Sequence, residues 1–142
     1  MYELDEFDFT VEDAGRDSHS THDFVRELKR RTKAVAINLV NLMERSGKSP
    51  ALGVIRYQLL KSGTSVAANY RAACRARSKN EWYAKMCIVV EECDETVFWL
   101  ELLLESEVTV DEVEVRTLGK EYFELLKIFA KARSTHKLNT TQ

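Results

Sequence analysis

Residues 60–104 read LKSGTSVAANYRAACRARSKNEWYAKMCIVVEECDETVFWLELLL. The first part of this stretch is crowded with small side chains, and the second part carries large apolar side chains at helical spacing. The two parts meet at Arg77 and Ser78, and Ser78 and Glu81 have the spacing of a capping box that begins a helix. The stretch therefore predicts two long helices that form a hairpin, on which the rest of the chain packs.

Two further segments show apolar residues three and four positions apart, which is typical of amphipathic helices. Gly47 suits the end of a helix and Pro50 the first turn of the next, while Thr109 and Glu112 form a second capping box. The expected helices cover residues 21–45, 51–76, 78–106 and 109–134. This order predicts an all-α fold, an antiparallel up-down four-helix bundle.

The length and composition indicate one domain. A chain of 142 residues, 44% of them hydrophobic and 31% charged, can bury a single core. We expect a flexible acidic leader over residues 1–20, the bundle over residues 21–134 and a frayed polar C-terminus over residues 135–142.

The compartment follows from the termini and the cysteines. The N-terminus lacks the basic start and apolar core of a signal peptide, and no apolar run is long enough to span a membrane. Cys74, Cys87 and Cys93 have no metal-binding spacing and fall in helical stretches, so we expect buried thiols in the cytoplasm.

Each helix carries an apolar face that we expect to be buried. The expected core positions are Phe24, Leu28, Val35, Leu39, Leu42, Leu52, Ile55, Leu59, Val66, Tyr70, Ala73, Trp82, Met86, Val89, Cys93, Val97, Leu100, Leu104, Val113, Leu118, Tyr122, Leu125, Phe129 and Ala132. The third helix has a second apolar stripe, formed by Tyr83, Cys87, Val90, Phe98 and Leu102, so it is either central or lies against a partner molecule. Small residues from Ser62 to Ala68, followed by Asn69, predict close helix packing rather than a phosphate loop.

Charge is segregated along the chain. The net charge is -6 over residues 1–19, +9 over residues 20–77 and -5 over residues 78–142. This distribution predicts a basic surface on the first half and charge complementarity between helices or subunits. The candidate nucleic-acid surface comprises Arg26, Lys29, Arg30, Arg71, Arg75, Arg77 and Lys79. The pI near 6.0 and the commonness of solvated charged helix faces argue against this interpretation.

The acids Glu91, Glu92, Asp94 and Glu95 are the one concentration of carboxylates within a bundle helix. A di-metal site would need Glu-x-x-His pairs on facing helices, whereas His19, His22 and His136 lie near the ends of the chain. We therefore expect no metal, no cofactor and no catalytic site, and interpret these acids as structural salt-bridge residues. Their candidate partners are Arg56, Lys61, Arg71 and Arg75.

Four motifs resemble the family of 23S rRNA intervening-sequence proteins in order and spacing. They are TSVAAN at residues 64–69, SKNEW at 78–82, VVEECDE at 89–95 and WLEL at 99–102, and the resemblance covers about residues 24–133. It implies an up-down bundle that forms rings, typically homopentamers, without enzymatic activity. Some relatives are accessory variability determinants of diversity-generating retroelements, basic barrels that bind nucleic acid and a reverse transcriptase.

Two features depart from the family pattern. Ala72 stands where many relatives carry Glu, and the acidic leader before Phe24 lies outside the usual pattern. Our hypothesis is a non-enzymatic, self-assembling scaffold for RNA or DNA, with a reverse transcriptase as one candidate protein partner. The alternative is a protein-interaction adaptor whose acidic leader docks a basic partner without nucleic acid.

Overall fold

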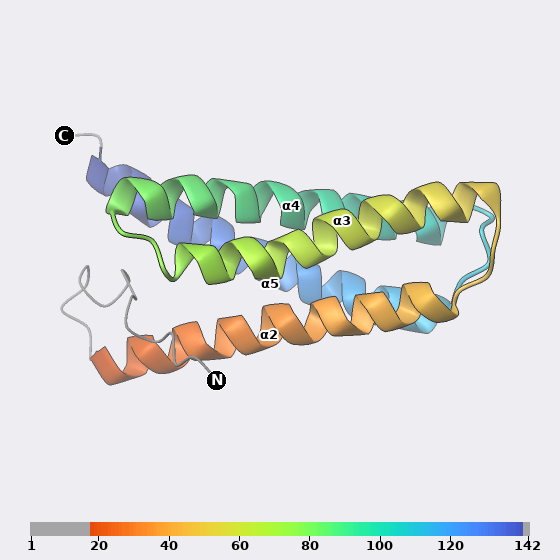
Figure 1. Cartoon of the computed structure of the whole chain (residues 1–142), viewed down its shortest axis with the longest axis horizontal. Helices are drawn as coiled ribbons and strands as arrows, with labels where there is room; N and C mark the ends of the chain where they lie inside the picture. The colour runs from red at the N-terminus through yellow and green to blue at the C-terminus, as the bar shows by residue number, and fades with distance from the viewer. Residues whose placement is uncertain (1–17, 141–142) are drawn as a thin grey trace.

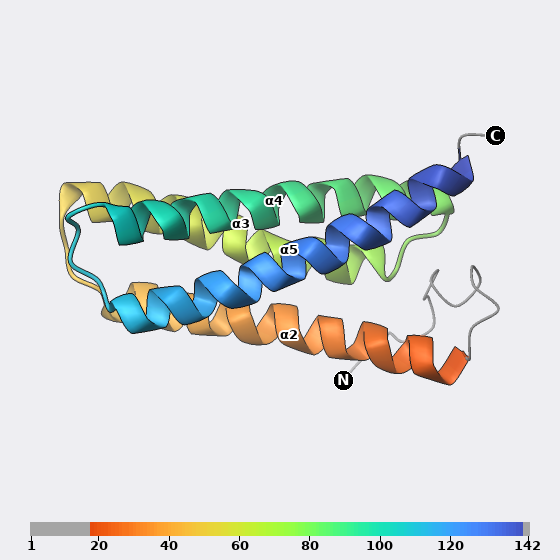
Figure 2. The same ribbon diagram turned by 180° about the vertical axis from the view of Figure 1, so that it is seen from behind.

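The computed structural model describes residues 18–140, with side chains over residues 21–135. Its helices are α2 (Ser18–Arg45), α3 (Pro50–Ala73), α4 (Lys79–Glu105) and α5 (Glu112–Thr140). They run alternately up and down an elongated bundle, joined by short connections at alternate ends (Figure 1). From behind, α5 crosses obliquely from the last turns of α2 towards α4 (Figure 2). This arrangement confirms the predicted all-α, antiparallel up-down bundle.

Side-chain hydrogen bonds cap both helix ends that the connection between α2 and α3 joins. The Ser49 hydroxyl accepts a hydrogen bond from the Leu52 amide (3.1 Å), and Pro50 occupies the first turn of α3. The Arg56 guanidinium donates to the carbonyl oxygens of Met43 (3.1 Å) and Gly47 (2.6 Å). An arginine of α3 thus binds a carbonyl group in the last turn of α2 and another in the connection that follows it.

The starts of α4 and α5 show how far the capping motifs were predictive. The Ser78 hydroxyl accepts from the Glu81 amide (3.1 Å), and the Glu81 carboxylate accepts from the amide of Arg77 (3.3 Å), one residue before the partner that a capping box requires. The box expected at Thr109 is wrong, because Asp111 accepts from the Glu114 amide (3.2 Å) and α5 begins at Glu112. Helix α5 extends to Thr140, into the segment that we expected to fray.

Helix α4 lies between α3 and α5 and packs extensively on both, whereas the contact between α2 and α5 is thinner. This explains the second apolar stripe of α4: Val90 is buried, and Tyr83 and Leu102 are half-buried against the core. Of that stripe, Phe98 is 52% exposed. Much of the second stripe is therefore explained by packing of α4 within the bundle, while Phe98 leaves part of it on the surface.

Most of the expected core positions are buried, and the errors lie near helix ends. Phe24 is 52% exposed and Val113 is 78% exposed, so both assignments are wrong. Val115 is buried instead of Val113, because Val115 lies three residues before the buried Leu118 and shares its face of α5, whereas Val113 lies five residues before it and points away. Val97, Leu104 and Ala132 are only half-buried against the core.

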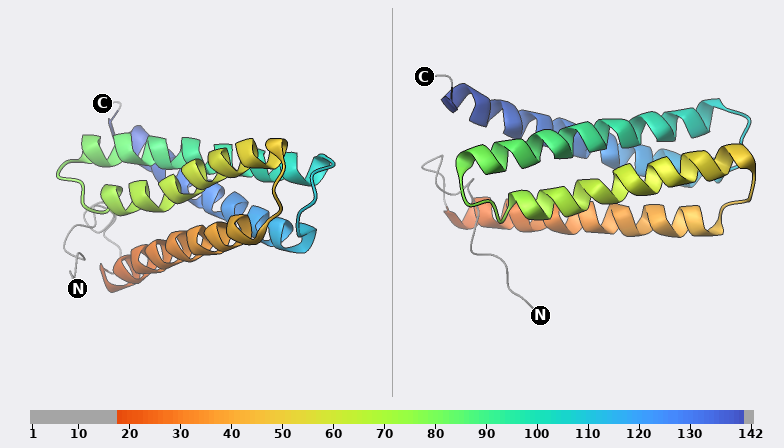
Figure 3. Two further views of the ribbon diagram at one scale, coloured as in Figure 1. Left: turned by 45° about the vertical axis from the view of Figure 1, so that its right-hand side comes forward. Right: turned by 45° about the horizontal axis from the view of Figure 1, so that its top comes forward.

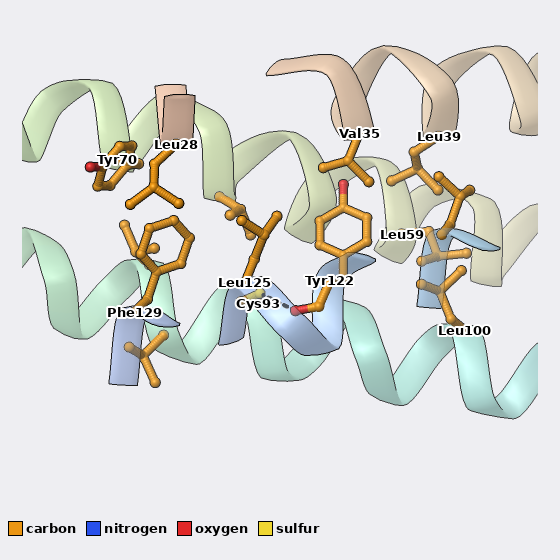
Figure 4. Packing of buried hydrophobic residues seen from close by; sticks show 14 of the residues in the cluster. Leu28, Val35, Leu39, Leu59, Tyr70, Cys93, Leu100, Tyr122, Leu125 and Phe129 are labelled. Atoms are coloured by element: carbon orange, nitrogen blue, oxygen red, sulfur yellow. Dashed lines mark hydrogen bonds between the residues drawn. The ribbon is translucent and has the colours of Figure 1, made fainter. Parts of the chain in front are cut away.

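In the middle of the bundle, the helices pack closely around Gly63. A Cβ atom at this position would collide with the Leu39 side chain and lie 2.9 Å from the Tyr122 hydroxyl. That hydroxyl donates to the Gly63 carbonyl oxygen (3.1 Å), and the Cys93 thiol donates to the carbonyl of Tyr122 (3.1 Å). Figure 4 shows Tyr122 within the buried cluster, its ring directed towards the side of Val35 and Leu39. The small residues do permit close packing at Gly63, although Ala68 is exposed and takes no part in it.

Candidate nucleic-acid interface

The up-down topology brings the basic segments to one half of the bundle. The start of α2, the connection between α3 and α4 and the end of α5 lie at the same end, at the left of Figure 1 and in both views of Figure 3. All seven candidate residues come from these segments: Arg26, Lys29 and Arg30 from α2, Arg71 from α3, Arg75 and Arg77 from the connection, and Lys79 from the first turn of α4. We call this the basic half.

Further bases of the basic half were missed at the level of sequence. They are Lys127, Lys131 and Arg133 on α5, whose second half returns to this end of the bundle and lies beside the start of α4 (Figure 2). The Lys127 ammonium stands 4.9 Å from the centroid of the Phe123 ring, a cation–π contact that leaves its charge in place. The basic last turns of α5 were the available signal, but the net acidity of residues 78–142 hid it.

Adjacent arginines of α2 serve different purposes. Arg31 is 19% exposed and donates to both carboxylate oxygens of Glu121 (3.2 and 2.5 Å), with Glu124 at 3.1 Å. These carboxylates raise the pKa of Arg31, and the pair ties α2 to α5 across their thin contact. Arg30 is 65% exposed and pairs with Glu27 one turn away on its own helix, which lowers the pKa of Glu27. Arg31 is therefore part of the fold, and Arg30 is part of the surface.

Arginines at the end of α3 and in the following connection remain available to an external anion. Arg71, Arg75 and Arg77 are exposed, and their side chains form no ion pair within residues 21–135. Exposed guanidinium groups can donate two hydrogen bonds to one phosphate. This group is the part of the basic half best suited to a polyanion.

The acidic run of α4 does not form the expected salt bridges in the described part of the chain. Arg56 caps α2 instead, and Glu95 accepts a hydrogen bond from the indole of Trp99 (3.3 Å). Burial raises the pKa of Glu92, helped by the neighbouring charge of Glu95, and the charge of Lys61 opposes this only in part. The acids thus lie beside one another, without the basic partners that would hold helix register.

Polar side chains in the middle of α3 and α4 are satisfied locally. The Asn69 amide donates to the carbonyl oxygen (3.0 Å) and hydroxyl (2.8 Å) of Ser65. The Thr96 hydroxyl lies 2.9 Å from that of Ser62 and 2.7 Å from the carbonyl oxygen of Glu92. These bonds are contacts within or between packed helices, and they satisfy polar groups that packing would otherwise leave unpaired.

Chemical groups that could react are sparse in the described residues. No cluster of three His, Cys, Asp or Glu side chains there could hold a metal ion. Burial raises the pKa of the Cys93 thiol to about 12, which keeps it protonated and a poor nucleophile. A hollow of about 490 Å³ between the two connections at the other end is lined by Lys48, Leu52, Glu107 and neighbours, with no His or Cys among them. None of the described helices combines the length and apolarity that crossing a bilayer requires.

The fold and this site define an antiparallel four-helix bundle with one basic half. The chain is similar to a crystal structure of a protein of unknown function from the S23 ribosomal protein family, from Bacteroides thetaiotaomicron VPI-5482. The two share 28% sequence identity and a TM-score of 0.70, over 78% of this chain and 97% of that chain. This similarity confirms the family resemblance that the four motifs indicated. No family model and no curated protein matches the chain.

Proposed function

We propose that this protein is a non-enzymatic, self-assembling cytoplasmic scaffold that binds RNA or DNA through its basic half. The observation that carries the proposal is the convergence of bases from α2, α3 and α5 at one end of the bundle. Bases that are separated by more than a hundred positions in the sequence, such as Arg26 and Arg133, thereby lie at the same end of the bundle. Phosphate contacts of this kind supply sequence-independent affinity that falls steeply with salt.

Assembly would multiply a weak affinity. Large apolar side chains are exposed on every helix: Phe24, Ile37, Val40, Val54, Tyr57, Phe98, Val113 and Phe123. Residues on different faces, such as Tyr57 on α3 and Phe123 on α5, suit a head-to-tail contact, which closes into a ring when the rotation permits. A homopentamer, as the family resemblance implies, would present five basic halves to one strand. Light scattering should then give a multiple of 16.4 kDa, and a monomer at micromolar concentration would contradict assembly.

The binding test is fluorescence anisotropy of the full chain with labelled single-stranded RNA and DNA oligonucleotides at several salt concentrations. We expect binding at low salt. The logarithm of the association constant should fall linearly with the logarithm of the salt concentration. The double variant Arg71→Glu/Arg75→Glu should weaken binding at least tenfold and reduce the salt slope by roughly 1.4, because each lost phosphate contact on a single strand removes about 0.7.

The matched control reverses two exposed bases at the other end of the bundle. Arg116 and Lys120 lie in the first turns of α5, so Arg116→Glu/Lys120→Glu changes the net charge equally without touching the basic half. Equal losses in both double variants would show that net charge alone governs binding. No binding by the full chain at low salt would refute the nucleic-acid function and favour the adaptor alternative.

A further inference from the structure

One outer face of α2 is basic along its first half and apolar further on. Arg26, Lys29, Lys33, Ile37 and Val40 succeed one another at intervals of three or four residues, so they form a single stripe along the helix. Ile37 is 50% exposed and Val40 is 42% exposed, on the side away from the core of the bundle. We call this face the α2 stripe.

The apolar part of the α2 stripe borders a hollow beside α3. This hollow has a volume of about 210 Å³ and is lined by Lys33, Ala36, Ile37, Val40, Asn41 and Ala67. Ala67 comes from the run of small residues in α3, and its short side chain leaves the space open. The hollow would accept one or two apolar side chains next to a positive charge.

The segment that precedes α2 has the complementary composition. Residues 1–17, which lie outside the described residues, hold seven acids and one base, together with Phe7 and Phe9. They join the chain at Ser18, the first residue of α2. The acidic, aromatic segment is therefore tethered at the basic end of the α2 stripe.

We propose that residues 1–17 fold back along the α2 stripe of the same chain and place Phe7 and Phe9 in the hollow at Ile37 and Val40. The lengths agree. Ile37 lies about 28 Å from Ser18 along the helix, at 1.5 Å per residue. The nine residues from Phe9 to Ser18 span about 30 Å when extended.

The charges match in the same register. The five residues from Asp13 to Ser18 span about 17 Å when extended, which is the distance along α2 from Ser18 to Lys29. Glu12, about 20 Å from Ser18, then lies between the levels of Lys29 and Lys33. The acids thus run beside the basic part of the α2 stripe while the aromatic residues reach its apolar part. Neither charge nor apolarity alone would select this register.

The docked leader would regulate binding, and this consequence rests on the proposed function. Docking covers the contribution of α2 to the basic half and brings about six negative charges next to the arginines of α3. A tethered polyanion competes at a high effective concentration, so nucleic acid would have to displace it. The exposed Arg71 and Arg75 remain as the first point of contact.

The direct test uses the full chain carrying Phe9→p-benzoylphenylalanine, irradiated in the absence of nucleic acid, with cross-linked peptides identified by mass spectrometry. We expect cross-links to α2 around Ile37 and Val40 or to α3 around Ala67, and a yield that falls with added salt. A mixture of isotopically light and heavy chains separates cross-links within a chain from those between chains. Cross-links between chains, cross-links confined to other surfaces, or none at all would overturn docking within the chain.

A matched pair of substitutions identifies the docking site. Ile37→Ser should lower the cross-linking yield at least threefold, whereas Val54→Ser, at a 62% exposed aliphatic position near the start of α3, should leave it unchanged. Both positions are surface positions, so neither change removes a core side chain. Equal yields in the two variants would refute the assignment to the hollow.

The regulatory consequence has its own measurement. Phe7→Ser/Phe9→Ser keeps the charge of the leader but removes its apolar anchor, so it should strengthen oligonucleotide binding at least threefold at low salt. Unchanged binding, in a chain that does bind, would overturn competition by the leader. If no variant binds nucleic acid while the cross-links form as expected, the leader docks and only the proposed function fails.

Discussion

The middle of the bundle and its basic half are built by opposite means. In the middle, α2, α3 and α5 approach so closely at Leu39, Gly63 and Tyr122 that no side chain fits at Gly63. In the basic half the helices end in exposed charges such as Arg71 and Arg75, which make no ion pair within the described residues. The middle therefore specifies the fold, and the basic half is left to interact with something else.

This difference separates two uses of the same residue types. Arg31 binds the carboxylate of Glu121, and Arg56 binds carbonyl oxygens at the end of α2 and in the following connection. Arg71 and Arg75 are exposed to solvent. Tyr122 is fully buried and hydrogen-bonded, whereas Tyr57 is 65% exposed. Substitutions should consequently affect stability in the middle and binding in the basic half, with little overlap.

The largest effect on stability is expected at Gly63. Gly63→Ala should destabilise the fold by about 2 kcal/mol, because the added Cβ overpacks a site closed by Leu39 and Tyr122. Gly53→Ala, in the same helix with no atom within 4 Å of the new Cβ, should stabilise by about 0.5–1 kcal/mol through helix propensity. Chemical denaturation of both variants measures the difference. Equal shifts in the two variants would mean that the bundle is not closed at Gly63.

The second effect sharpens the boundary between the two regions. Arg31→Ala should cost about 1.5 kcal/mol, because it leaves Glu121 without the guanidinium that ties α5 to α2. Arg30→Ala, one residue away and paired only within α2, should leave the denaturation midpoint nearly unchanged. The loss in Arg31→Ala should shrink at high salt. A comparable loss in Arg30→Ala would contradict the distinction between them.

A smaller effect is expected at the Tyr122 hydroxyl. Tyr122→Phe removes the bond to the Gly63 carbonyl oxygen and should cost about 1 kcal/mol, since the ring still fills its site. Tyr57→Phe removes a hydroxyl from an exposed position and serves as the control. Indistinguishable urea midpoints for the two variants would show that the Tyr122 bond contributes nothing net.

The smallest effect concerns pH. Burial raises the pKa of Glu92 in the folded chain, so the fold is favoured while Glu92 is protonated, and this contribution is lost as pH rises from the unfolded pKa through the folded one. Glu92→Gln should therefore be more stable than the unsubstituted chain at about pH 7 and should lose this advantage at about pH 3.5. Denaturation at the two pH values tests the sign. An advantage confined to low pH would contradict the raised pKa.

The periodicity of apolar residues predicted the helices and most of the core, because burial follows spacing along a helix. It failed at Phe24 and Val113, which lie near helix starts. At α5 the phase was right, and the error was the choice of Val113, which lies five residues before the buried Leu118, in place of Val115, which lies three residues before it. The small residues of α3 indicated close packing. Only the positions of the neighbouring helices show that Gly63 is in close contact with α2 and α5 and that Ala68 is exposed.

The sequence by itself determined the bundle, the Ser78 cap and the supply of basic residues, because these depend on neighbours within a few turns. Only the tertiary structure decided which charges are free. It pairs Arg31 with Glu121 and places Arg56 at the end of α2. It also brings Lys127 and Arg133 of the acidic C-terminal segment to the same end of the bundle as the bases of α2 and α3. The physical reason is that the antiparallel arrangement places the start of α2 and the end of α5 at the same end of the bundle, so charge that is segregated along the sequence is redistributed along the bundle axis (Figure 1).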